Sequence, residues 1–197
     1  MTLPSDPKGQ PVGTFWLVDL VRPLPTAPDP LLPATFLRLG PEDAGELAQA
    51  MRCADAEIVQ QRFSADKHCY GGKIEGEIAT YGWVTFDQEN IGELDLNIHL
   101  APDAAYIWDC ATLPAYRGQH LYAALLAYIV RALHAMSLRH AWIGADADNL
   151  PSQAGMVRAG FRPVVDIVSS PASPGLHLRG RPGTPEQLVN DMRAALR

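Results

Sequence analysis

The sequence predicts a mixed α/β (α+β) domain with a mostly antiparallel central sheet flanked by helices. The first indication is the order of the expected elements, because strand-like segments precede and follow a strand–helix–strand–helix unit in the second half of the chain. The second is the hydrophobic content of 47%, which is enough for one sizeable core. The third is the length, since 197 residues suit one domain with extensions better than two full domains.

We interpret residues 1–33 as a proline-rich N-terminal arm. The segment RPLPTAPDPLLP (22–33) cannot sustain a helix or a central strand, because proline lacks the backbone N–H and fixes φ. The preceding segment TFWLVDLV (14–21) is apolar and rich in residues that favour strands. We therefore expect the arm to add an edge strand to the sheet or to cover it.

The main domain is expected over 34–181. In its first half, alternating or β-branched and aromatic segments indicate strands, and the helices have acidic residues near their starts. We expect strands over 34–39, 68–86 (two strands around a tight turn at Glu75–Gly76), 92–100 and 105–113. We expect helices over 40–52, with Pro41 in its first turn, and 55–63.

In the second half, apolar residues such as Leu121, Leu125 and Ile129 recur at helical spacing and predict a helix over 119–136. A strand over 140–147, a helix over 150–160 ending at Gly160, and a closing hairpin of 161–170 and 175–180 follow. A C-terminal helix is expected within 182–197, with Thr184 as N-cap and Pro185 at its first position.

The composition excludes several classes of protein. The formal charge of −6 argues against nucleic-acid binding and against a polybasic membrane-surface protein, and it mildly favours a cationic substrate. No apolar run approaches the roughly 20 residues that span a bilayer, and the N-terminus lacks the apolar core of a signal peptide. We therefore expect no nucleic-acid or membrane partner.

The cysteines and histidines indicate neither a metal site nor a disulfide framework. Cys53, Cys69 and Cys110 are odd in number and scattered, without a CxxC pair. His68 and His99 do not add metal-ligand spacing to them. We expect no metal, and free thiols suit a reducing, cytoplasmic location.

The segment around residues 112–122 has the features of an anion site. A strand ends at Thr112, a turn over 113–118 contains Pro114, and a helix then begins. Residues 117–122 would present unpaired backbone N–H groups at the positive end of the helix dipole, where phosphate binds readily. Arg117 adds a guanidinium whose fork matches phosphate oxygens.

This segment, ATLPAYRGQHLYAALL (111–126), resembles the acetyl-CoA-binding segment of the GNAT superfamily of N-acetyltransferases. A second segment, NLPSQAGMVRAGF (149–161), is similar to the family's motif on the helix after the next strand. The resemblance covers roughly residues 35–168. It implies a GNAT-like sheet whose central strands splay apart, and acetyl-CoA as cosubstrate.

The resemblance also implies site residues. The CoA diphosphate would lie on Arg117, Gly118, Gln119, His120, Leu121 and Tyr122. The pantetheine arm would pair with the backbone of Cys110, Ala111 and Thr112, and Asn149 and Ser152 would contact it or the far side of CoA.

The sequence departs from the family pattern at three positions. His120 and Tyr122 replace two glycines of the motif, and Met156 replaces the tyrosine that protonates the departing thiolate in many members. Either another acid serves here, or the thiolate leaves without one.

The implied reaction is direct attack of a neutral amine on the thioester, which requires a group that takes a proton. Period-two parity puts Tyr106, Trp108 and Cys110 on one face of their strand, with Ile107 and Asp109 on the other. If Cys110 faces the cleft, Tyr106 does too and is the first candidate for the catalytic group. A bulge in this strand would instead bring Asp109 into the cleft.

The function we expect is transfer of an acetyl or short acyl group from CoA to a primary amine of a small molecule or peptide. The resemblance leaves a homodimer open. A non-catalytic acyl-CoA-binding or sensing domain is the alternative, and a Cys110-dependent hydrolase is a third class. Each motif residue also has a simpler structural explanation: a surface salt bridge for Arg117, packing for Cys110, and capping of the following helix for Asn149 and Ser152.

Overall fold

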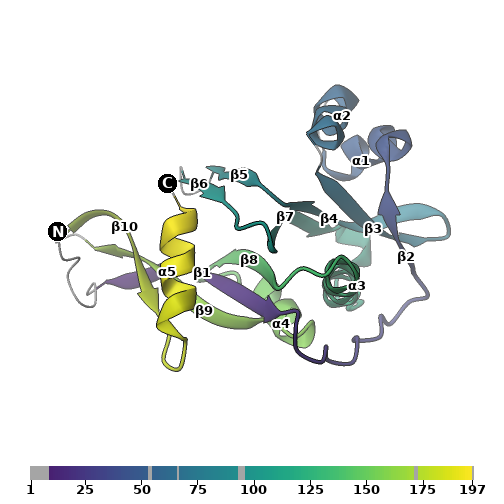
Figure 1. Ribbon diagram of the computed structural model, residues 1–197. Coiled ribbons are helices and arrows are strands. Elements are labelled where there is room, and N and C mark those ends of the chain that lie inside the picture. Colours follow the sequence, from purple (N-terminus) through teal and green to yellow (C-terminus); the bar gives the residue numbers. More distant parts are fainter. Residues whose placement is uncertain (1–8, 53–54, 66, 93–95, 171–172, 197) are drawn as a thin grey trace.

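The computed structural model describes residues 9–52, 55–65, 67–92, 96–170 and 173–196. Cys53, which entered the cysteine count, lies outside these residues. The chain folds as a mixed α/β structure in which helices flank a mostly antiparallel sheet, so the predicted fold class is confirmed (Figure 1).

The strands are β1 Gln10–Asp19, β2 Thr35–Leu39, β3 His68–Ile74, β4 Glu77–Thr85, β5 Gln88–Ile91, β6 Leu96–His99, β7 Ala104–Thr112, β8 His140–Asp146, β9 Arg162–Ser170 and β10 Ser173–Gly180. The helices are η1 Pro41–Asp43, α1 Ala44–Ala50, α2 Ala56–Ser64, η3 Pro114–Tyr116, α3 Leu121–Ala135, α4 Leu150–Arg158 and α5 Glu186–Ala195.

Eight strands form the main sheet in the order β10-β9-β1-β8-β7-β4-β3-β2. Neighbouring strands are antiparallel except β7 and β8, which are parallel. Strands β5 and β6 form a separate hairpin, of which the sequence analysis predicted only the second strand. Strands β3 and β4 meet at the predicted turn, where Glu75 (φ 51°) and Gly76 (φ 91°) both have the left-handed backbone of a tight hairpin.

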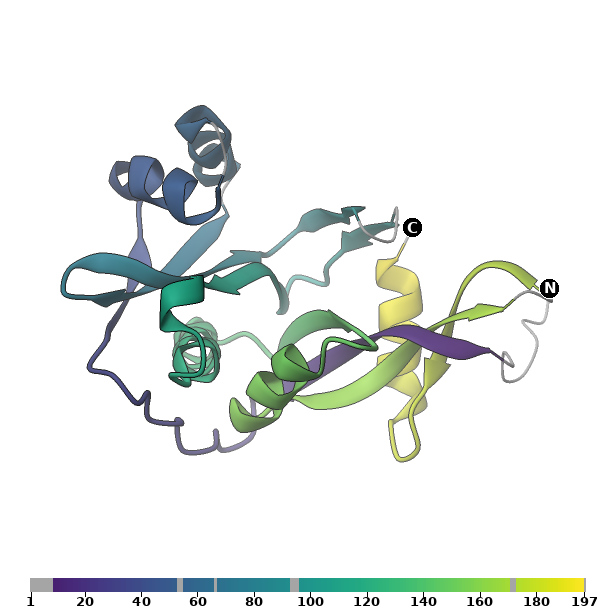
Figure 2. The same ribbon diagram turned by 180° about the vertical axis from the view of Figure 1, so that it is seen from behind.

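Helices cover both faces of the sheet. Figure 2, seen from behind, shows α3 and α4 on one face and α1 and α2 on the other, with α5 beside β9 and β10. Adjacent residues of the central strands contribute to opposite faces. Ile107 and Ile143 pack into the cluster under α3, whereas Tyr106 and Trp142 pack into the cluster beside α5. None of the described helices has the length and apolar character needed to cross a membrane.

Strand β1 corrects one expectation about the N-terminal arm. It lies inside the sheet and pairs antiparallel with both β8 and β9, so it is neither an edge strand nor a cover. Residues Phe15 to Val18 are all buried, because helices cover the sheet on both sides of this strand. A continuous apolar run is typical of such a doubly covered strand, and each such side chain contributes about 1.5–3 kcal/mol on burial.

The proline-rich segment after β1 contains no helix or strand, as predicted, and leads back to β2 at the far edge of the sheet (Figure 1). It is held against α3 at several points. The Arg131 guanidinium donates to the Pro25 carbonyl (3.0 Å), and His134 Nδ1 lies 2.7 Å from the Leu20 carbonyl. The Leu31 N–H donates to the carbonyl of Gln119 (2.9 Å), directly before α3. The boundaries of the arm and of the domain stay predictions.

The start of α5 differs slightly from its prediction. Pro185 takes the N-cap position and the helix begins at Glu186. Thr184 does not cap it, because its hydroxyl donates to the Val164 carbonyl of β9 instead (3.0 Å). The threonine therefore ties the helix start to the sheet.

Candidate active site

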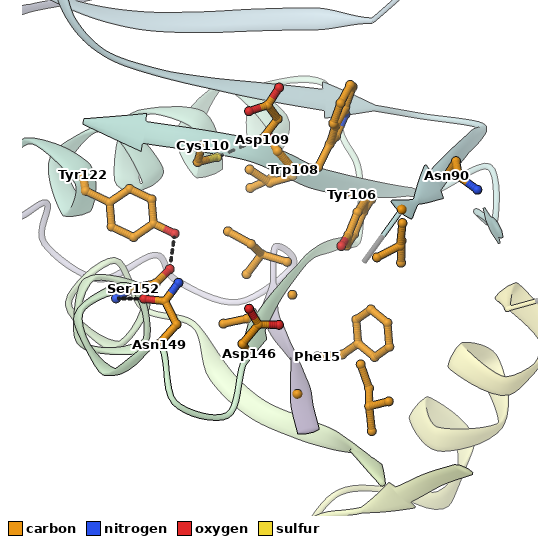
Figure 3. A pocket seen from close by; sticks show the side chains of 18 of the residues that line it. Phe15, Asn90, Tyr106, Trp108, Asp109, Cys110, Tyr122, Asp146, Asn149 and Ser152 are labelled. Atoms are coloured by element: carbon orange, nitrogen blue, oxygen red, sulfur yellow. Dashed lines mark hydrogen bonds between the residues drawn. The ribbon is translucent and has the colours of Figure 1, made fainter. Parts of the chain in front are cut away.

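The central parallel strands separate halfway along their length. Strands β7 and β8 pair only from Ala104–Ile107 to His140–Ile143, although β7 continues to Thr112 and β8 to Asp146. The predicted splaying of the central strands is thus confirmed. Between the diverging halves lies a cavity of about 880 Å³, which Figure 3 shows. We call it the splay cavity.

A β-bulge in β7 decides which side chains face this cavity. Tyr81 pairs with Ala111 but Trp83 pairs with Trp108, so β7 has one extra residue, and Asp109 has φ 42°. Cys110 then packs on the α3 side of the sheet, whereas Tyr106 packs on the opposite side. A Cβ at Gly82 would lie 2.7 Å from the Cys110 sulfur, which shows how closely this side chain fits the sheet.

The parity argument that put Tyr106 and Cys110 on one face is therefore wrong, because the bulge interrupts the period of two. The alternative prediction, that β7 contains a bulge, is confirmed. Tyr106, Asp109 and Cys110 nevertheless all line the splay cavity, since it opens between both faces of the divided sheet. Their catalytic or binding roles stay predictions.

Asp109 is held by an ion pair. Its Oδ2 accepts from Nη1 of Arg62 on α2, at 2.5 Å. The guanidinium also lies over the ring of Trp108, 4.6 Å from its centroid, in a favourable cation–π arrangement. The carboxylate oxygen that could accept a substrate proton is thus engaged with Arg62, which reduces its suitability as a base.

Tyr106 lies in the wall of the splay cavity opposite Gly144 of β8. A Cβ at Gly144 would be 3.0 Å from the Tyr106 hydroxyl oxygen, so the missing side chain leaves room for the phenol. The ring packs edge-on against Phe15 of β1, with centroids 6.5 Å apart. The arm strand therefore helps to position this candidate residue, a contact that the sequence did not predict.

A second cavity, of about 660 Å³, lies at the start of α3, and we call it the helix-start cavity. All residues implied for diphosphate binding line it: Arg117, Gly118, Gln119, His120, Leu121 and Tyr122. His120, the N-cap, has φ 59°, the left-handed conformation that glycine would favour, and its side chain does not cap the helix. The amides of the first turn are thus not capped by that side chain.

Two cationic side chains line the helix-start cavity. Arg117 is exposed, and its Nε donates to the Thr112 carbonyl at the end of β7 (3.3 Å). Within the described residues Arg117 forms no ion pair, contrary to the simpler explanation of a surface salt bridge. Arg158, in the last turn of α4, is a second cation that the sequence analysis missed.

The two cavities are adjacent. Cys110, Tyr122, Asn149 and Ser152 line both of them. Asn149 caps α4, because its side-chain oxygen accepts from the Ser152 N–H (3.2 Å), so the capping explanation is confirmed for Asn149. It does not hold for the Ser152 side chain, whose hydroxyl lies 2.9 Å from the Tyr122 hydroxyl instead. The position of Asn149 in both cavities leaves the predicted contact with a ligand possible as well.

Met156 lies outside both cavities. It is 1% exposed and belongs to the apolar cluster under α3, so its side chain points into the core rather than toward the site. At this position of α4, Met156 therefore serves as a core residue in place of the phenol that many family members carry.

The surroundings of Cys110 do not activate its thiol as a nucleophile. Burial raises the pKa of its thiol, with the Asp109 carboxylate adding to the effect and a backbone hydrogen bond to Trp83 opposing it. A reactive cysteine needs the opposite shift, because the thiolate is the attacking species. The hydrolase interpretation therefore has no support in this geometry.

Three residues of the splay cavity with polar or charged side chains were missed by the sequence analysis: Arg62, Asn90 and Asp146. Asp146 could have been noticed, because it ends a buried strand. Arg62 and Asn90 come from α2 and from the β5–β6 hairpin, which reach the site only through tertiary packing. Within the described residues, no group of three or more His, Cys, Asp and Glu side chains is arranged to hold a metal ion.

Comparisons with known proteins agree with this architecture. The solved structure of a GCN5-related N-acetyltransferase from Sphaerobacter thermophilus is similar with a TM-score of 0.57 and 18% identity, over 89% of this chain and 54% of that chain. A GNAT-family acetyltransferase from Colwellia psychrerythraea has a TM-score of 0.55 and 12% identity, over 80% of this chain and 54% of that one. An aminoglycoside acetyltransferase from an uncultured soil metagenomic sample has a TM-score of 0.51 and 14% identity, over 64% of this chain and 87% of that one.

The chain spans only about half the length of the first two of these structures. No curated protein matches its sequence. Residues 37–161, more than half of the chain, match the acetyltransferase (GNAT) family. The match contains the splayed strands and both cavity-lining motifs. The chain therefore belongs to the GNAT acetyltransferase family.

Proposed function

We propose that this protein is an N-acetyltransferase that moves an acetyl or short acyl group from CoA to a primary amine by direct attack. One observation supports the proposal: the cavity at the start of α3 shares four lining residues with the larger cavity between the diverging β7 and β8. This arrangement would let a long donor reach from its phosphates to the reacting carbon.

The residues present fit CoA. The helix dipole of α3, the first-turn amides and the Arg117 guanidinium suit the diphosphate, and Arg158 adds a further positive charge to the same cavity. Beyond Ile107, no strand among the described residues pairs with the side of β7 that faces β8. An extended pantetheine arm can pair with the backbone of Cys110 to Thr112 there, as a strand would.

The splay cavity would receive the amine. Asp146 lines it, and its carboxylate has no hydrogen bond or ion pair among the described residues. In Figure 3 this carboxylate lies between Asn149 and Phe15, and the Tyr106 hydroxyl lies above Phe15 on the side of β7. We assign Asp146 to attract the amine and take its proton, Tyr106 to orient the amine or a water, and Asp109 to hold Arg62 in the cavity lining.

The chemistry follows from this arrangement. The amine loses a proton to Asp146, directly or through water, and its nitrogen forms a bond to the thioester carbonyl carbon while the bond to sulfur breaks. No acyl-enzyme is needed, and Cys110 stays a thiol throughout. The acceptor is a small-molecule or peptide amine, and a cationic one matches the overall charge of −6. A cytoplasmic location and a homodimer stay predictions.

Calorimetric titration with acetyl-CoA, together with thiol release over a panel of primary amines, tests the proposal. We expect binding and turnover with at least one amine. Binding without turnover on any amine would favour the acyl-CoA-sensing domain, for which the buried Met156 is the supporting observation. Absence of acetyl-CoA binding would contradict both functions.

A further inference from the structure

We propose that the hydroxyl of Tyr122 delivers the proton to the sulfur that leaves during acyl transfer. This assignment rests on the proposed function. The position of the phenol supports the assignment, because Tyr122 is one of the four described residues that line both cavities. A donor that extends from the helix-start cavity into the splay cavity would run beside Tyr122, so the proposal puts its thioester sulfur next to the phenol.

The ring of Tyr122 is held in place by α4. Tyr122 is the second residue of α3, and its ring lies against the backbone of Gly155. A Cβ at Gly155 would be 2.4 Å from Tyr122 Cδ1 and 2.8 Å from Cε1, so only glycine leaves room for the ring there. The hydroxyl lies 2.9 Å from the Ser152 hydroxyl, which fixes its direction toward the passage, as Figure 3 shows.

The other residues at the junction are poorer proton donors. The Asn149 amide does not release protons at neutral pH, and its oxygen is engaged in capping α4. The Cys110 thiol packs against Gly82 inside the sheet. Ser152 has an alkyl hydroxyl, a weaker acid than a phenol. Because Met156 is buried in the core, α4 offers only Ser152 from its own side chains at this junction.

The protonation state of Tyr122 agrees with this role. Burial raises the pKa of the phenol, the nearby Cys110 adds to the shift, and the hydrogen bond with Ser152 opposes it. The hydroxyl therefore carries its proton at neutral pH. A proton donor must be protonated when the bond to sulfur breaks. The raised pKa also makes the phenol a weaker acid, so the transfer depends on the negative charge that develops on sulfur in the same buried surroundings.

The step balances without a further reactant. As the nitrogen–carbon bond forms and the carbon–sulfur bond breaks, the electron pair of that bond goes to sulfur. The Tyr122 proton moves to sulfur and yields the free thiol of CoA. The phenolate then regains a proton through the Ser152 hydroxyl or solvent, and this return balances the proton that the amine released to Asp146.

Tyr122→Phe tests the assignment, because phenylalanine keeps the ring against Gly155 and removes only the hydroxyl. Tyr128→Phe is the matched control: it is the same change on the same helix, outside both cavities. We expect Tyr122→Phe to lower kcat about 100-fold or more, the range for a lost general acid, with KM for acetyl-CoA changed less than about threefold. The control should keep the wild-type kcat.

A binding measurement separates a proton donor from a structural residue. Wild-type protein should bind CoA several-fold more tightly than desulfo-CoA, which lacks the sulfur. In Tyr122→Phe this preference should vanish while the affinity for desulfo-CoA, which reports an intact site, stays the same. A variant with wild-type kcat, or with the CoA preference retained, overturns the assignment. Failure of the wild-type protein itself to bind CoA would instead refute the proposed function.

Discussion

Arg62 of α2 and Asp109 of β7, which both line the splay cavity, form an ion pair with Arg62 Nη1 and Asp109 Oδ2 2.5 Å apart. The two residues are 47 positions apart in the chain. The pair exists because the bulge at Asp109 gives this residue a left-handed backbone and turns its side chain toward α2. It joins the helical layer over β3 and β4 to the strand that forms the edge of the site.

The ion pair should contribute modestly to stability. Both side chains are partly exposed, at 22% and 31%, so solvent screens their attraction. A double-mutant cycle with Arg62→Gln and Asp109→Asn, read from the free energy of unfolding, should give a coupling of about 0.5–1 kcal/mol. Arg62→Gln alone should cost more than Asp109→Asn alone, because Arg62 also stacks on Trp108. The more exposed pair Arg22–Asp19 is the control and should couple less; an equal coupling would contradict the role of burial.

Arg117→Ala should weaken CoA binding by about 1–3 kcal/mol, the range for a lost charged hydrogen bond. Calorimetric titration measures the change. The loss should be equally large with dephospho-CoA, which keeps the diphosphate but lacks the 3′-phosphate. Arg38→Ala, at the exposed edge strand β2, is the control and should bind both ligands like the wild-type protein. Unchanged affinity in Arg117→Ala would remove this residue from the diphosphate site.

Gly155→Ala should damage the site through Tyr122. The new Cβ would lie 2.4 Å from the ring, and the resulting displacement should cost about 1–3 kcal/mol of unfolding free energy and reduce CoA affinity. In a Tyr122→Ala background the same Gly155→Ala change should cost much less, because the clashing ring is absent. Gly45→Ala, in α1 with open space around its Cβ, should instead stabilise the protein by up to about 1 kcal/mol. If Gly155→Ala stabilised the protein as Gly45→Ala does, the close contact would be disproved.

Substitutions of Met156 should affect stability and not chemistry. Met156→Ala should cost about 2–5 kcal/mol by opening a cavity in the core, and Met156→Leu less than about 1.5 kcal/mol. Met156→Tyr should destabilise the protein by about 1–3 kcal/mol through overpacking and should not raise the rate of thiol release. A faster, equally stable Met156→Tyr protein would show that this side chain reaches the site.

The thiols of Cys69 and Cys110 should react slowly in the folded protein. Burial is the main cause of the raised pKa at both thiols, so at pH 8 the folded protein holds less thiolate than free cysteine does. Alkylation by iodoacetamide, followed site by site with mass spectrometry, should be at least about tenfold slower in the folded protein than in urea. The rate should rise only well above the ordinary cysteine pKa. Rapid alkylation of Cys110 at pH 7 would revive the hydrolase interpretation.

Local patterns in the sequence determined most of the elements of this protein and identified many of the residues that line one cavity. The turn at Glu75–Gly76, the helix from Leu121 and the capping of α4 by Asn149 depend on residues close together in the chain, so period and capping signals predicted them. The same holds for the loop of Arg117 and the amides after it, which form one wall of the helix-start cavity.

Tertiary packing decided the rest. β1 lies inside the sheet because β8 and β9 pair with its two edges, and a proline-rich segment beside it gives no sign of those partners. The bulge at Asp109 reverses the faces of β7, and a period of two cannot reveal one inserted residue. Arg62, Asn90 and Asp146 meet only in the folded chain. Periodicity records which residues are buried, whereas register and long-range contacts depend on which segments meet, and that is set by the whole fold.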